Sequence, residues 1–198
     1  AGVDATWTSS ATVQLPFWTA FAAFFFGLTA GLLQIVPEAA IAARERRVGV
    51  GATTYVLSKV AALAPTLIGV SVGLLLALRS FDRLPTAPGW SPASLVVTVL
   101  LLAASALTVG LLASALVRDS SQAALALPML CFPQVLFAGA VVAVDDMAPA
   151  GRILSNGMST RWGFEGITDS LGLAGGTPPT EVWAILGAIT VGMLGATV

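Results

Sequence analysis

Histidine is absent from this 198-residue sequence, which also contains a single cysteine, a single lysine and few charged residues of any kind. The absence of histidine removes the commonest general base and the commonest metal ligand. The single cysteine, Cys131, excludes an intramolecular disulfide, and its apolar neighbours indicate that it acts as a small hydrophobic side chain. We therefore expect no metal site in this chain and no catalysis that depends on histidine.

Charge is scarce as well as unevenly placed. Charged residues make up 10% of the sequence and hydrophobic residues 57%, with a mean hydropathy of +0.92. A soluble domain carries about 25% charged residues. The net charge of −1 excludes no class of protein by itself, because the positions of the charges along the sequence matter more than their sum. The composition indicates an integral membrane protein.

Five apolar segments have the length, or nearly the length, of about 20 residues that a helix needs to cross a bilayer. They are residues 17–36, 55–78, 94–117, 123–144 and 182–198. None alternates in polarity as the strands of a membrane barrel would, and lipid offers the backbone no hydrogen-bond partners, so each is predicted to be a helix. The predicted fold class is an all-α polytopic helical bundle. We interpret residues 1–198 as one transmembrane domain, an excerpt from a longer protein, because the sequence lacks a starting Met and a signal peptide and ends inside an apolar run.

The orientation is predicted from lysine and arginine in the short loops. Positive charge is densest between the first two spans, and most acidic residues lie in the loops on the other side. We therefore place residues 38–54 and 118–122 in the cytoplasm, and residues 1–16, 79–93 and 145–181 outside. The count of basic residues alone favours this orientation by only five to four.

Two loops have features of their own. Residues 38–47 contain five of the nineteen charged side chains and favour a short helix on the cytoplasmic face, although a solvated loop whose arginines only set the topology fits the same pattern. The loop at 145–181 is long for a connection without structure and contains aromatic residues that favour the membrane interface. We expect one or two short helices there, with a flexible loop as the alternative.

Polar and helix-breaking residues inside the spans are few. Pro65, Pro128 and Pro133 are predicted to kink or break their helices, as in transport pathways, or simply to pack there. The pairs Gly69/Gly73 and Ala103/Ala104 suit close packing between helices. The sequence contains no G-x-x-x-x-G-K-[ST] motif, so it holds no nucleotide through a P-loop.

Residues 37–68, 118–142 and 159–167 carry motifs that, in this order, resemble one family, the type-2 ABC exporters of the G (white) subfamily. Residues 37–68, PEAAIAARERRVGVGATTYVLSKVAALAPTLI, resemble the region between its second and third spans. The matching features there are Glu38, the Glu45–Arg46 pair, Gly49, Tyr55-Val-Leu-Ser-Lys59 and Pro65. The stretch RDSSQAALALPMLCFPQVLFAGAVV resembles the fifth span, and STRWGFEGI resembles an outer re-entrant segment with its pattern of Arg161, Trp162 and Glu165. The resemblance covers residues 17–198 and is closest to actinobacterial members with fused forkhead-associated domains and an ATPase.

The resemblance implies a six-span domain, of which five spans are seen, working as a dimer in a bacterial plasma membrane. It implies a fused or separate ABC ATPase as partner, with ATP and Mg²⁺ bound there, and no catalytic residue or nucleic-acid contact in this chain. The charged loop would be the coupling helix that rests on the ATPase. The residues implied in coupling are Glu38, Arg44, Glu45, Arg46 and Arg47.

The resemblance also implies a pathway for an amphipathic or lipid-like substrate at the dimer axis, between the first and fourth spans seen here. The implied lining residues are Phe24, Phe25, Gln34, Phe132, Gln134, Leu136 and Phe137. Two other functions stay open. A secondary permease would need ionisable groups in mid-span, and a membrane-embedded hydrolase or transferase would use Asp145, Asp146 and Glu165.

Overall fold

The computed structural model describes residues 9–32, 34–35, 38, 51–84, 90–117, 119–173 and 175–198. Within these ranges the regular secondary structure is helical, with seven α-helices, the 3₁₀-helix η2 (Val144–Asp146) and no strand. The α-helices are α1 (Ser9–Leu32), α3 (Ala52–Ser80), α4 (Pro92–Leu116), α5 (Ser120–Leu136), α6 (Pro149–Asn156), α7 (Ser159–Ser170) and α8 (Pro179–Thr197), with η2 between α5 and α6. The predicted all-α helical bundle is confirmed.

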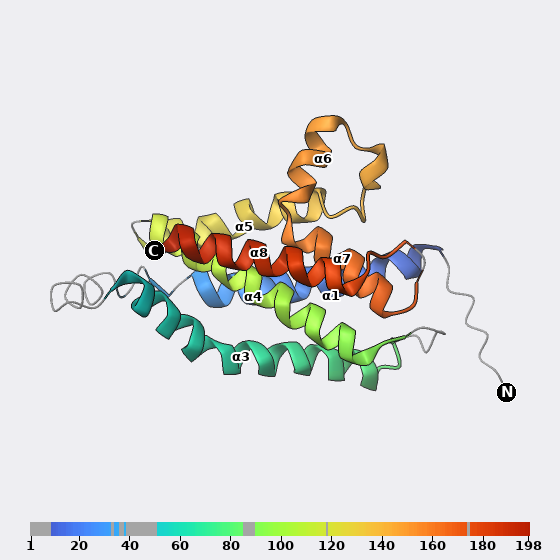
Figure 1. Ribbon diagram of the computed structural model, residues 1–198, viewed down its shortest axis with the longest axis horizontal. Coiled ribbons are helices and arrows are strands. Elements are labelled where there is room, and N and C mark those ends of the chain that lie inside the picture. The colour runs from blue at the N-terminus through green and yellow to red at the C-terminus, as the bar shows by residue number, and fades with distance from the viewer. Residues whose placement is uncertain are drawn as a thin grey trace.

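Four of these helices are long and apolar enough to cross a membrane: α1 over Val13–Leu32, α3, α4 and α8. They correspond to four of the five predicted spans. The remaining one, predicted at residues 123–144, contains α5, which at 17 residues is shorter than the other four. In Figure 1 the long helices run along the longest dimension of the molecule, while α6 stands away from them.

Helix α4 lies at the centre of the bundle and contacts α1, α3, α7 and α8. Its sequence is apolar on every face, which is typical of a helix buried all round. The side chains of Val99, Leu102, Leu107 and Leu111 are completely or almost completely buried. The bundle is therefore organised around a helix that other helices cover on several sides.

Glycine allows α1 and α4 to approach each other closely. A Cβ atom on Gly27 would lie 2.2 Å from the carbonyl oxygen of Ala103, and one on Gly31 would lie 2.4 Å from that of Leu107. Gly110 meets the backbone of α1 in the same way. The spacing Gly27-x-x-x-Gly31 is the small-residue pattern that brings membrane helices into backbone contact.

The structure corrects two predicted helix boundaries. Helix α1 begins at Ser9 and includes Pro16, whereas the predicted segment began at residue 17. Helix α5 ends at Leu136, not at residue 144. Pro133 removes one backbone donor near that end, and Gly139 has a φ of +86°, a left-handed conformation that a continuing helix excludes.

The long connection after α5 is folded, which confirms the predicted short helices. It contains η2, α6 and α7, and α7 packs against α1, α4 and α8. A Cβ atom on Gly163 would lie 2.3 Å from the Leu102 side chain, and one on Gly166 would lie 2.8 Å from that of Val182. Because Leu102 lies ten residues into α4, α7 reaches about 15 Å along the bundle from the end where α4 begins.

Candidate functional site

The charged loop is connected to helix α3 at its beginning. Glu38 forms an ion pair with Lys59, on the second turn of α3, and the ammonium group donates a hydrogen bond to the carboxylate. Lys59 also lies 5.8 Å from the centre of the Tyr55 ring, one turn earlier in α3. These contacts fix the start of the loop to α3. Arg44, Glu45, Arg46 and Arg47 lie outside the described residues, so their predicted role in coupling stays a prediction.

Helix α7 carries a group of polar side-chain contacts. Nε of Arg161 lies 2.9 Å from Oε1 of Glu165, and both side chains are mostly buried, with 13% and 16% of their surface exposed. The guanidinium group also lies over the Trp162 ring, 4.5 Å from its centre. The three residues of the predicted Arg-Trp-x-x-Glu pattern therefore form one interacting group.

Two residues outside that pattern complete the group. The side-chain oxygen of Asn156 accepts a hydrogen bond from Arg161, and the Asn156 carbonyl accepts one from the Trp162 indole at 2.9 Å. The Thr177 hydroxyl donates to Oε2 of Glu165. Glu165 thus joins α7 to the segment before α8. Sequence reasoning missed Asn156 and Thr177, since the Asn156–Gly157 pair signals a turn but not its partners.

Gln134 connects α5 to the beginning of α7. Its side-chain oxygen accepts a hydrogen bond from the backbone N–H of Thr160 at 3.0 Å, and only 7% of Gln134 is exposed. Three hydroxyls in this region, those of Ser155, Ser159 and Thr160, are buried without a hydrogen-bond partner in the described part of the chain. The junction of α6 and α7 is therefore polar although it is enclosed by the protein.

The other predicted pathway residues differ in their exposure. Phe24 is fully buried and packs with Leu28 of α1 and Cys131 of α5, which behaves as the small hydrophobic residue we expected. Phe132, Leu136 and Phe25 are exposed, at 69%, 40% and 36%. Gln34 and Phe137 are half-buried. Phe24 and Cys131 thus fill part of the space between α1 and α5. Phe25, Phe132 and Leu136 lie on the outside of these helices.

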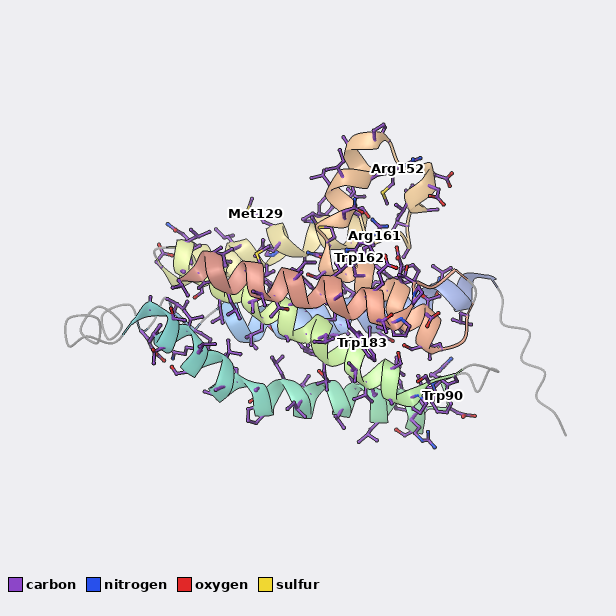
Figure 2. The ribbon with its side chains drawn as sticks, in the orientation of Figure 1. Trp90, Met129, Arg152, Arg161, Trp162 and Trp183 are labelled. Carbon is purple, nitrogen blue, oxygen red and sulfur yellow. The ribbon has the colours of Figure 1, made fainter. Side chains whose placement is uncertain are left out.

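Apolar residues on one face of α5 are strongly exposed. Leu125, Met129 and Phe132 are each about seventy per cent exposed, and Leu136 lies one turn further along. Their spacing of three or four residues places them on a common face of the helix. Figure 2 shows Met129 on the outer side of α5, away from α4. Lipid or another protein surface is the environment that suits this face.

A comparison with protein families gives one match. Residues 3–171 match the model of the ABC-2 type transporter family. The chain belongs to this family. No curated protein matches the chain. As an ABC-2 membrane domain it is a membrane protein and part of an ABC transporter, and domains of this family generally work with an ABC ATPase.

Membership of the ABC-2 family weighs against the two other predicted functions. Asp145 and Asp146 are exposed in η2, and Glu165 is engaged by Arg161 and Thr177. The described residues contain no group of three side chains suited to a metal ion. The three carboxylates proposed for a hydrolase are therefore not assembled as an active site in the described structure.

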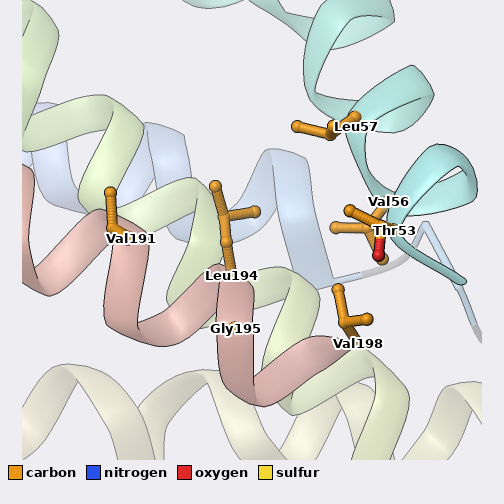
Figure 3. Close-up of a pocket in the computed structure, with 7 residues that line it drawn as sticks. All are labelled: Thr53, Val56, Leu57, Val191, Leu194, Gly195 and Val198. Carbon is orange, nitrogen blue, oxygen red and sulfur yellow. The ribbon is translucent and has the colours of Figure 1, made fainter.

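The ABC-2 domain has an open apolar groove between the beginning of α3 and the end of α8. It encloses about 340 Å³ and is lined by Val56, Leu57, Val191 and Leu194 among others. Figure 3 shows the side chains of the two helices facing each other across it. Lys59 lies two residues beyond Leu57, which lines this groove, so the helix that carries the Glu38 ion pair also forms one wall.

Proposed function

We propose that this ABC-2 domain is the membrane-spanning half of an ATP-driven exporter in a bacterial plasma membrane. Two copies would work together with two ATPase domains and alternate between inward-facing and outward-facing states. ATP and Mg²⁺ would bind to the ATPase, and the chain itself would supply the substrate pathway. The observation that carries this proposal is the family match over residues 3–171.

The coupling of ATP hydrolysis to transport is assigned to residues 38–47. Charge suits such a segment, because it must stay out of lipid and contact a polar partner. The Glu38–Lys59 ion pair supports the assignment, since a force applied to the loop would reach α3 through it. Glu45 and Arg46 correspond to the Glu-Arg pair of the G-subfamily pattern and are the first residues to test.

The substrate pathway is assigned to the region between α1 and α5 at a dimer axis. The exposed apolar face of α5 supports this assignment, because such a face suits either an apolar substrate or the second copy of the domain. An amphipathic or lipid-like substrate matches walls that carry Phe25, Phe132 and Leu136. The Arg161–Glu165 group would hold the outer segment above this pathway.

The G-subfamily assignment rests on the three sequence motifs, and the finer assignment to the fused forkhead-associated kind rests on the composition of the chain. Sequencing the gene around this domain tests it directly. A P-loop ATPase with one further span ahead of Ala1 supports the assignment, and forkhead-associated domains support the finer one. If neither the same gene nor its neighbours encode an ABC ATPase, the proposal is wrong.

The functional test uses the complete transporter in vesicles of phosphatidylcholine and phosphatidylglycerol. ATP-dependent movement of a fluorescently labelled phospholipid between leaflets is measured together with ATP hydrolysis. We expect Glu45→Ala to uncouple the two, so that hydrolysis continues while transport falls. The control, Glu181→Ala, changes an exposed carboxylate at the beginning of α8 and should leave both unchanged. Unchanged transport in Glu45→Ala would show that the coupling assignment is wrong.

A further inference from the structure

The boundary between α3 and α4 contains two apolar grooves that follow each other along the helices. The first encloses about 160 Å³ near the end of α3, between Leu76 and Arg79 of α3 and Val96 of α4. The second encloses about 290 Å³ further along, between Ala64 of α3 and Ala104 of α4. Every residue that lines the second groove is apolar. Together the two grooves follow α3 from Val60 to Arg79.

The length of this path fits the hydrocarbon part of a bilayer. Val60 and Arg79 are 19 residues apart, which corresponds to about 28 Å of helix. The hydrocarbon core of a bilayer is about 30 Å thick. A lipid acyl chain that starts beside Arg79 and follows the grooves for half of the bilayer core would end near Ile68 and Leu101, inside the second groove.

The charged and hydrogen-bonding side chains that line the two grooves lie at one end of the path. Arg79 lines the first groove, is exposed, and has no carboxylate within ion-pair distance among the described residues. Trp90 lines the same groove, and its indole N–H is buried without a hydrogen-bond partner in the described structure. Figure 2 shows Trp90 beside the end of α3, where α4 begins. One cation and one donor therefore lie where an apolar groove begins.

We propose that the α3–α4 boundary binds one anionic phospholipid, with an acyl chain in the grooves and the phosphate beside Arg79 and Trp90. A phosphodiester accepts hydrogen bonds from both a guanidinium and an indole group. The mostly apolar lining of both grooves suits an acyl chain. A groove that ends at a cation and at an indole donor unpaired in the described structure matches a molecule with an apolar chain and an anionic head.

This lipid site is separate from the proposed substrate pathway. Figure 1 shows α3 and α5 on opposite sides of the bundle, with α1, α4 and α8 between them. The pathway was assigned to the α1–α5 side, so a lipid on the α3–α4 side would be a bound component and not the transported molecule. The inference therefore stands whether or not the chain proves to be half of an exporter.

Native mass spectrometry of the intact transporter tests the site. The purified protein is titrated with palmitoyl-oleoyl phosphatidylglycerol or with phosphatidylcholine carrying the same acyl chains. We expect one phosphatidylglycerol per copy of the domain to be retained in preference to phosphatidylcholine. Arg79→Gln removes a charged hydrogen-bond donor and should weaken the binding of phosphatidylglycerol by about tenfold or more. Trp90→Phe removes only the indole donor and should weaken it by less.

Two further variants separate the site from general effects. Arg83→Gln removes an exposed arginine that does not line the groove and should leave the binding unchanged. Ala104→Phe fills the second groove and should reduce the occupancy of both lipids. The thermal melting temperature of each variant shows whether it is folded. Equal retention of the two lipids, or equal losses in Arg79→Gln and Arg83→Gln, would overturn the proposal, as would wild-type binding in both Arg79→Gln and Trp90→Phe.

Discussion

The side chain of Gln134 in α5 holds the first turn of α7 by accepting a hydrogen bond from the backbone N–H of Thr160 at 3.0 Å. The first N–H groups of a helix have no partner inside the helix, so an acceptor must come from elsewhere. Here it comes from a residue 26 positions earlier in the chain. Helices α5 and α7 are thereby connected at a buried point.

Replacing Gln134 tests how much this connection contributes. Gln134→Met keeps the length of the side chain but leaves the Thr160 N–H without its acceptor, so we expect a loss of about 1–3 kcal/mol in the free energy of unfolding. Unfolding in a titration with denaturing detergent measures it. Leu136→Ala, at a 40% exposed position on the same helix, is the control and should cost less. Equal losses would mean that the hydrogen bond adds nothing specific.

The Arg161–Glu165 ion pair is expected to be sensitive to the loss of either partner. Both side chains are mostly buried, so Glu165→Gln leaves an uncompensated cation and should cost about 3 kcal/mol in unfolding free energy. The double variant Arg161→Met/Glu165→Met should be more stable than Glu165→Gln, because no unpaired charge remains. Asp145→Asn changes an exposed carboxylate and is the control. If the double variant is the least stable of the three, the pair itself supplies the stability.

The hydropathy of local segments predicts much of the fold, but not every helix end. The apolar segments predicted at 55–78 and 94–117 lie within or almost within α3 and α4. The predicted end of the segment at 123–144 was wrong, because hydropathy does not register the change of backbone direction at Gly139. The apolar composition therefore predicted which segments form helices, but not where the helix in this segment ends.

The packing partners of small residues could not be predicted in the same way. Ala103 does pack closely, but its partner is Gly27. The predicted pair Gly69 and Gly73 is open instead, since a methyl group added at either position would have no described atom within 4 Å beyond the adjacent backbone of its own helix.

The contacts of the α7 polar group could be predicted only where the two residues are close in the sequence. The Arg161–Glu165 pair is local, four residues apart, whereas the contacts of Glu165 with Thr177 and of Gln134 with Thr160 depend on how the helices come together.

The Glu38–Lys59 pair should matter more for coupling than for stability. Glu38 is 39% exposed in its side chain, and an ion pair in such a position contributes about 0.2–1 kcal/mol. We therefore expect Glu38→Lys to change the melting temperature little but to reduce ATP-dependent lipid transport in the complete transporter. The exchanged variant Glu38→Lys/Lys59→Glu should restore part of that transport. A failure of the exchange to restore any transport would indicate that the individual side chains, and not their pairing, are required.

The close approach of α1 and α4 makes Gly27 the glycine whose substitution should be most damaging. In Gly27→Ala the new methyl group would lie 2.2 Å from the Ala103 carbonyl oxygen and 2.9 Å from the Ala106 Cβ, so the two helices must separate. Overpacking of this kind costs about 1–3 kcal/mol. Gly69→Ala makes the same chemical change on α3, where the new methyl group would have no described atom within 4 Å beyond the adjacent backbone of its own helix. Because alanine favours a helix over glycine, this control should lose no stability.

Titration with denaturing detergent, followed by circular dichroism, compares the two variants with the wild type. The expected order of stability is Gly69→Ala equal to or above the wild type, and Gly27→Ala below both. Equal stability of all three would mean that α1 and α4 separate at no cost. A loss confined to Gly69→Ala would instead assign close packing to the exposed face of α3, where only a second copy of the domain or another protein could supply the contact.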